Sequence, residues 1–130
     1  MKQVTAAILI NDGLIFIAKR KADDSSGEKW EFPGGTIEDG ESPEDCLKRE
    51  MEEEFEMGVS IGEYLGESIY LYDHGWIRLL AYRAYWESGN IVAKVHEDYQ
   101  WVSKGELSNY LFAPADIPFV EKLMNGKIET

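Results

Sequence analysis

The alternation of apolar and polar positions predicts a chain that is rich in β-strands. Apolar runs at residues 4–10 and 14–18 flank Asn11, Asp12 and Gly13, which tolerate the positive φ angles of a tight turn. These two runs therefore predict a β-hairpin. Similar runs predict further strands at residues 30–32, 60–65, 68–72 and 76–86, with a turn at residues 73–75.

The spacing becomes helical after residue 41. Ser42 has the hydroxyl of a good N-cap, and Pro43 fits the first helical position. Leu47, Met51 and Phe55 then recur every fourth residue and form one apolar stripe. The pattern predicts a helix that starts at Ser42 and buries this stripe.

Helical signals return near the end of the sequence. Residues 103–107 resemble a cap followed by a short helix, and a longer helix is predicted to end near residues 125–126. The apolar face of this longer helix is formed by Val120, Leu123 and Met124.

Length and composition indicate one soluble globular domain, residues 1–130. The sequence is 44% hydrophobic, and we expect neither a signal peptide nor a membrane span because no apolar run is long enough. The single cysteine, Cys46, cannot form an internal disulfide, which fits a reducing cytoplasm. We interpret its small side chain as packing rather than as a reactive thiol. Residues 23–28 are polar and predict a loop.

The acidic residues predict a metal site. A net charge of −12 disfavours binding to nucleic-acid polymers or anionic membranes. Glu50, Glu53 and Glu54 stand at i, i+3 and i+4, so they share a helix face within an arc of about 100°. Carboxylate ligands favour Mg²⁺ or Mn²⁺ over zinc, and Gly34 and Gly35 would let main-chain groups approach a ligand. The alternative is a solvated acidic helix that follows an ordinary turn.

The spacing of these residues resembles a family motif. From Gly35 the chain reads glycine, five residues, Glu41, seven residues, and then REMEEE at residues 49–54. This resembles the Nudix box, G-x5-E-x7-R-E-U-x-E-E-x-G-U with U apolar, at every fixed position but one. The exception is Glu56, where the family has glycine, and Gly58 is expected to end the helix instead.

The resemblance implies an α/β fold, the Nudix-type α/β/α sandwich with a mixed β-sheet, over nearly the full chain. It implies Mg²⁺-dependent (or Mn²⁺-dependent) hydrolysis of a nucleoside triphosphate to monophosphate and pyrophosphate, for nucleotide-pool clean-up. The expected substrates are oxidised dGTP, CTP, dCTP or a modified pyrimidine nucleotide. Two alternatives are cleavage of ADP-ribose or a nucleotide sugar, and a noncatalytic nucleotide-binding module. The only partner expected is the small nucleotide substrate. The protein is expected in the cytoplasm, as a monomer or a homodimer.

The resemblance also implies which residues perform the chemistry. The metal ligands would be Glu50, Glu53, Glu54 and the Gly35 carbonyl. Arg49 and Glu41 would orient these carboxylates without touching the reacting phosphorus. Glu97 precedes a Trp-Val strand and is the candidate for an additional metal ligand or the general base, with Asp98 as a second choice and Glu53 as a rival base.

A MutT-like and CTP pyrophosphohydrolase-like branch of the family suggests the substrate contacts. Arg20 would approach the nucleotide, and Phe32 would help to form the base pocket, although core packing is an equal interpretation. Asp116 would hydrogen-bond the base, with an ordinary helix cap as the alternative. Thr36 stands where this branch commonly has lysine. His74, in a predicted turn, is expected to be exposed rather than catalytic.

Overall fold

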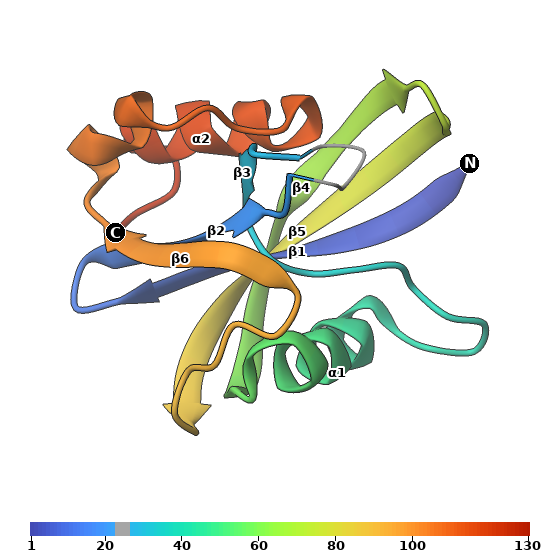
Figure 1. Cartoon of the computed structure of the whole chain (residues 1–130), viewed down its shortest axis with the longest axis horizontal. Coiled ribbons are helices and arrows are strands. Elements are labelled where there is room, and N and C mark those ends of the chain that lie inside the picture. The colour runs from blue at the N-terminus through green and yellow to red at the C-terminus, as the bar shows by residue number, and fades with distance from the viewer. Residues whose placement is uncertain (23–26) are drawn as a thin grey trace.

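The computed structural model describes residues 1–22 and 27–130 as a mixed β-sheet with helices on both faces (Figure 1). The strands of the described residues are β1 (Lys2–Asn11), β2 (Leu14–Arg20), β3 (Trp30–Glu31), β4 (Gly58–Tyr72), β5 (Gly75–Ser88) and β6 (His96–Val102). The helices are α1 (Pro43–Phe55), α2 (Ile117–Met124) and the short 3₁₀ helices η1 (Lys104–Asn109) and η2 (Pro114–Asp116). The predicted α/β/α fold class is confirmed. No helix that the structure describes is both long and apolar enough to cross a membrane.

The sheet runs in the order β3-β2-β1-β5-β4, and β6 pairs with β2. β1 and β5 are parallel, whereas the other pairs are antiparallel. β1 and β2 pair only beside their turn, where Ile10 faces Ile15. Farther along β1, the loop after β3 pairs with β1 where β2 would otherwise lie. Ala7 N donates to the Pro33 carbonyl there, at 2.7 Å. This loop, Pro33-Gly34-Gly35, is called the glycine loop below, and the bond fixes it against the middle of the sheet.

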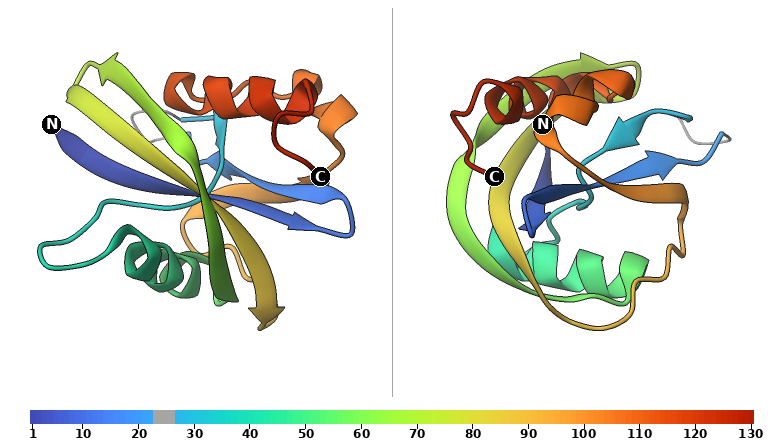
Figure 2. Two further views of the ribbon diagram at one scale, coloured as in Figure 1. Left: turned by 180° about the vertical axis from the view of Figure 1, so that it is seen from behind. Right: turned by 90° about the vertical axis from the view of Figure 1, so that its left-hand side faces the viewer.

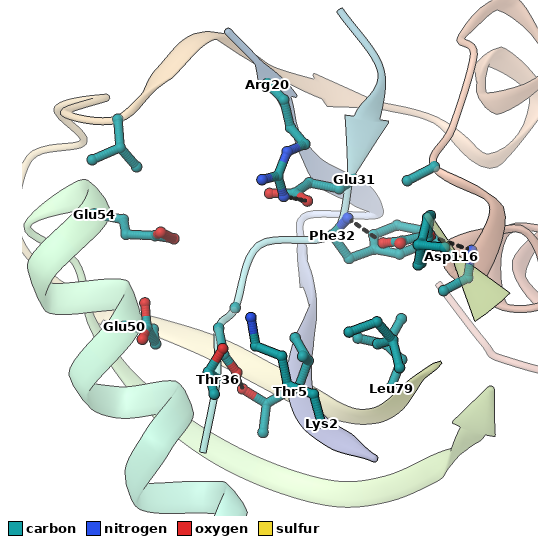
Figure 3. A pocket seen from close by; sticks show the side chains of 18 of the residues that line it. Lys2, Thr5, Arg20, Glu31, Phe32, Thr36, Glu50, Glu54, Leu79 and Asp116 are labelled. Carbon is teal, nitrogen blue, oxygen red and sulfur yellow. Dashed lines mark hydrogen bonds and ion pairs between the residues drawn. The ribbon is translucent and has the colours of Figure 1, made fainter. Parts of the chain in front are cut away.

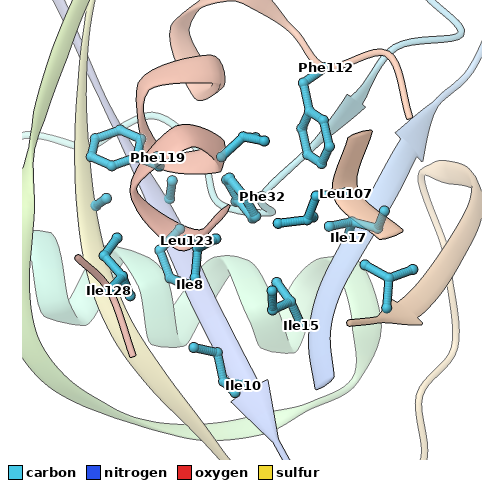
Figure 4. Packing of buried hydrophobic residues seen from close by; sticks show 14 of the residues in the cluster. Ile8, Ile10, Ile15, Ile17, Phe32, Leu107, Phe112, Phe119, Leu123 and Ile128 are labelled. Carbon is cyan, nitrogen blue, oxygen red and sulfur yellow. The ribbon is translucent and has the colours of Figure 1, made fainter. Parts of the chain in front are cut away.

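Alternation along β1 separates two hydrophobic clusters. Ala6, Ile8 and Ile10 belong to the cluster beneath α2 (Figure 4), while Ala7 and Leu9 belong to the cluster beneath α1. The two helices consequently cover opposite faces, and β4 and β5 curve around the side of the molecule (Figure 2).

The predicted α1 stripe is confirmed. Leu47, Met51 and Phe55 are fully buried, and the Phe55 ring meets Phe16 edge-on with centroids 5.1 Å apart. The Ser42 hydroxyl accepts from Asp45 N at 3.1 Å and caps the helix as expected.

Four local predictions need correction or lie outside the described chain. The predicted strands 60–65 and 68–72 are one strand, β4, because register shifts and the positive φ of Gly66 (127°) absorb the irregularity between them. α1 ends before Glu56, which adopts φ 56° and ψ 32°, so the prediction that Gly58 ends it is wrong. Met124 is 45% exposed and does not complete the buried face of α2. Of the loop predicted at residues 23–28, residues 23–26 lie outside the described residues.

Candidate active site

One open pocket of about 850 Å³ lies between α1, the glycine loop and the segment that leads into α2. Glu50 and Glu54 project into one end of it from α1 (Figure 3). Phe32 and Asp116 line the opposite end, and Arg20 lies between the two ends. The pocket therefore joins an acidic end to an aromatic end.

One carboxylate of the acidic end has an oxygen without a hydrogen-bond partner among the described residues. Glu54 Oε1 is buried and has no hydrogen-bond partner among the described residues. Burial, and then the nearby charges of Glu50 and Glu31, raise the pKa of Glu54 to about 8. Burial also raises the pKa of Glu50. These two carboxyls would ionise more readily beside a cation.

The donor set fits a hard divalent cation in part. Glu50 and Glu54 offer carboxylate oxygens one helical turn apart, and Mg²⁺ is commonly held by one or two carboxylates together with water and substrate phosphates. Within the described chain, however, no three His, Cys, Asp or Glu side chains converge closely enough to hold an ion by themselves. The Glu53 side chain is 57% exposed and is directed towards Arg49 instead of the pocket.

Arg49 holds the acidic end in place. Its Nε and Nη2 donate to both carboxylate oxygens of Glu41, at 2.7 and 3.0 Å. Its Nη1 donates to Glu50 at 2.9 Å and to Glu53 at 3.2 Å. The side-chain hydrogen bond from Arg49 is the largest cause that lowers the pKa of Glu41 to about 2. Arg49 therefore pairs with the carboxylates as predicted, and Glu41 pairs with Arg49, while the orienting role of the two residues stays a prediction.

The missing side chain of Gly35 makes room for a carboxylate of α1. A Cβ at Gly35 would lie 2.2 Å from Glu50 Cδ, so the absence of a side chain makes room for this carboxylate. The Gly35 carbonyl accepts from Thr5 N at 2.8 Å and from Thr5 Oγ1 at 3.2 Å. Two donors occupy an oxygen with two lone pairs, so this carbonyl would have to give up one of these bonds to bind a metal, and its role as a ligand stays a prediction. Cys46 is buried beneath this loop, as the packing interpretation expects.

Glu97 is not among the residues that line the pocket. It lies on β6, is 47% exposed, and places Oε2 3.3 Å from Lys19 Nζ. Its neighbour His96 lines the pocket instead, because successive strand residues point to opposite faces. The second choice, Asp98, accepts from Tyr99 N at the surface.

Glu31 and His96 line the pocket, although sequence reasoning assigned them no role. Glu31 uses one carboxylate oxygen to accept from Arg20 Nη1 at 2.9 Å, and the other lies 2.8 Å from His96 Nε2. His96 is buried and stacks on Phe55. A glutamate between two aromatic residues could have indicated Glu31, but nothing local indicates His96, which lies 65 positions away.

The aromatic end is closed by a long-range hydrogen bond. Phe32 is buried against Phe112, and its backbone N–H donates to Asp116 Oδ2 at 2.9 Å. Asp116 stands at the N-cap position of α2, as the helix-cap alternative expects, but its side chain makes no capping bond there. Burial raises its pKa well above the usual range. Phe32 both packs in the core and lines the pocket, so its two interpretations are compatible. His74 is exposed at the rim, where it stacks on Tyr72.

The chain is similar to known proteins in both sequence and fold. A family model described as "NUDIX domain" matches residues 1–123. The chain is 36% identical over 124 residues to the CTP pyrophosphohydrolase of Escherichia coli (strain K12), covering 95% of this chain and 92% of the relative. It is 34% identical over 124 residues to the 8-oxo-dGTP diphosphatase of the same organism, covering 93% and 95%. The solution structure of the E. coli ORF135 protein is similar, with a TM-score of 0.83 and 34% identity over 98% of this chain and 91% of that one.

Proposed function

The chain belongs to the Nudix family, and from this premise we propose that it hydrolyses a nucleoside triphosphate to the monophosphate and pyrophosphate with Mg²⁺ or Mn²⁺. The observation that carries the proposal is that Glu50 and Glu54 lie opposite Phe32 and Asp116 in the same pocket. A nucleotide bridging the two ends would place its base on the aromatic end and its phosphates beside the carboxylates.

Glu50 and Glu54 would hold the divalent cation. When bound, that cation would neutralise phosphate oxygens and make water a better nucleophile. Arg49 fixes the direction of Glu50 through a bond of 2.9 Å, and Glu41 in turn fixes Arg49. Arg20, held by Glu31, would contact the nucleotide midway along the pocket.

Glu53 and Glu97 are the two candidates for the base that takes the proton of the attacking water, and each is also a candidate further metal ligand. Glu53 would have to leave Arg49, and Glu97 would have to leave Lys19. Both side chains are about half exposed, so a change of rotamer is open to each of them.

The base class follows from Asp116. Its carboxyl lines the pocket and would bond the exocyclic amine of cytosine, or the exocyclic amine or a ring N–H of oxidised guanine. The names of the two relatives, CTP pyrophosphohydrolase and 8-oxo-dGTP diphosphatase, support the same two bases. We place the protein in the cytoplasm, as a monomer or homodimer that removes damaged or surplus nucleotides.

The test is release of pyrophosphate from a panel of CTP, dCTP, methylated dCTP, oxidised dGTP and ADP-ribose with Mg²⁺. Glu53→Gln is expected to lower turnover by about 100-fold or more, the scale of a lost acid/base group. Glu52→Gln is the matched control, because Glu52 is an exposed neighbour on α1 that does not line the pocket. The turnover of Glu97→Gln, measured in the same way, shows which of the two candidates is the general base.

Release of pyrophosphate from one or two triphosphates, lost in Glu53→Gln and kept in Glu52→Gln, would support the proposal and identify the nucleobase that the pocket accepts. Activity on ADP-ribose alone would contradict the proposed substrate, and no activity on any compound would favour a noncatalytic binding module.

A further inference from the structure

Lys2 is the exposed end of a row of β1 residues that becomes buried farther along the strand. Val4, Ala6 and Ile8 follow it at every second position of β1, and Ala6 and Ile8 are in the cluster beneath α2. The core ends at Val4, which lines the pocket together with Lys2. The cross-strand partner of Lys2 on β5, Ile77, lines it as well. A charged residue therefore occupies the position where the row leaves the core and reaches the cavity.

The Lys2 ammonium is directed into the cavity. Figure 3 shows it between the carboxylates of α1 and the Phe32 and Asp116 end, and Thr36 lines the same pocket. Thr36, which bridges to Val4 in the sheet, is uncharged and brings no cation to the glycine loop.

Lys2 differs from the other charged side chains around the pocket in its ion pairing. The acids that line it are Glu31, Glu38, Glu50, Glu54 and Asp116. The lysine and arginine side chains that line it, within the described residues, are Lys2 and Arg20. Arg20 is bonded to Glu31 at 2.9 Å, and the Glu38 carboxylate lies 3.5 Å from Arg49 Nη1. Lys2 forms no ion pair with any residue in the part of the chain that the structure describes.

We infer that Lys2 binds the phosphate chain of the substrate. The inference rests on the proposed function, because it takes the anion to be a nucleoside polyphosphate. An ammonium without a carboxylate partner is available to a phosphate oxygen, and it offsets the acids that would otherwise repel the anion. Lys2 and Arg20 come from different strands and lie along the passage between the two ends of the pocket. The phosphates would cross between them.

The test compares Lys2→Met, Lys2→Arg and wild type on the triphosphate that wild type hydrolyses best. Lys104→Met is the matched control, because Lys104 is exposed on η1 and does not line the pocket. Lys2→Met is expected to raise KM about 5- to 20-fold and to change kcat by less than about twofold, since the lost charge-assisted contact is to bound substrate. Lys2→Arg should keep most of the affinity, and the KM difference should shrink as salt is added.

Binding of inorganic tripolyphosphate and of the unphosphorylated nucleoside, each followed by calorimetry, identifies the group that Lys2 contacts. Weaker binding of tripolyphosphate with unchanged binding of nucleoside supports the inference. Unchanged tripolyphosphate binding overturns it, and so does a loss confined to the nucleoside, which would place Lys2 at the base. If wild type hydrolyses no triphosphate, the proposed function fails, while the tripolyphosphate comparison still decides the role of Lys2.

Discussion

The backbone N–H of Phe32 donates to Asp116 Oδ2 at 2.9 Å, although 84 positions separate the two residues. The bond ties the strand that enters the glycine loop to the segment that begins α2. It therefore fixes the width of the pocket at the end where the base is proposed to bind.

Asp116→Asn is expected to change base preference. Asparagine keeps an oxygen to accept from Phe32 N, but it adds an amide donor and removes the acid. The ratio of kcat/KM for CTP to that for oxidised dGTP should change by about tenfold or more, the range of one buried hydrogen bond. The concentration of Mg²⁺ for half-maximal rate should stay the same. An unchanged ratio would remove Asp116 from the recognition of the base.

Gly35→Ala is expected to impair activity far more than stability. The new Cβ would overlap the Glu50 carboxylate, the movable end of a side chain, so Glu50 would be displaced while the fold is kept. We expect kcat/KM to fall about 10- to 100-fold with a loss of stability of only about 1 kcal/mol. Enzyme assays and urea unfolding measure the two effects.

Two other glycines serve as controls for this prediction. In Gly105→Ala the new Cβ would have only Ser103 Oγ within reach, at 4.0 Å, so neither kcat/KM nor stability should change. Gly34→Ala would place Cβ 1.9 Å from the Thr5 carbonyl oxygen, so it should destabilise the fold itself. Loss of stability without loss of specific activity in Gly35→Ala would contradict the role assigned to Gly35.

The stability of the metal-free protein is expected to fall as the pH rises. The pKa of Glu54 is about 8 in the fold against an ordinary 4.5, so the folded state binds this proton more tightly than the unfolded state. Its contribution is fully present below the unfolded pKa and is lost as the pH rises through the folded pKa. Between about pH 5 and pH 9, the free energy of unfolding in EDTA should drop ~2 to 4 kcal/mol more for wild type than for Glu54→Gln.

Addition of Mg²⁺ at about pH 9 should restore stability to wild type, because a ligand that binds only the folded state stabilises it. Glu54→Gln should respond much less. Urea unfolding at each pH, with and without the ion, measures both effects. A parallel pH profile in the two proteins would mean that Glu54 does not titrate in this range.

Glu56→Gly is expected to stabilise the protein. Glu56 ends α1 in the left-handed region, where a residue with a Cβ is strained and glycine is not. Allowing for the greater freedom of glycine in the unfolded chain, the gain should be ~0.5 to 1 kcal/mol. Glu56→Gln keeps the Cβ and removes only the ion pair with Lys94, so it should give no gain in thermal unfolding. Equal stability of Glu56→Gly and wild type would show that the left-handed position costs nothing here.

The sequence by itself determined the local elements and the acidic face of α1. Ser42 and the stripe of Leu47, Met51 and Phe55 specify this helix through capping and spacing, both of which act within a few residues. The same spacing fixes Glu50 and Glu54 on one side of it. The hairpin of β1 and β2 was predictable for the same reason, since Asp12 and Gly13 adopt the positive φ angles of the turn.

Only the tertiary structure decided which side chains share the pocket. The Phe32–Asp116 bond, the Glu31–His96 contact and the place of Lys2 depend on strand register and on how the two helices pack. Glu53 and Glu97 fit the sequence pattern, yet they pair with Arg49 and Lys19 outside the pocket lining. Periodicity encodes the local backbone and the buried face, whereas contacts between distant segments come from the joint packing of the whole chain.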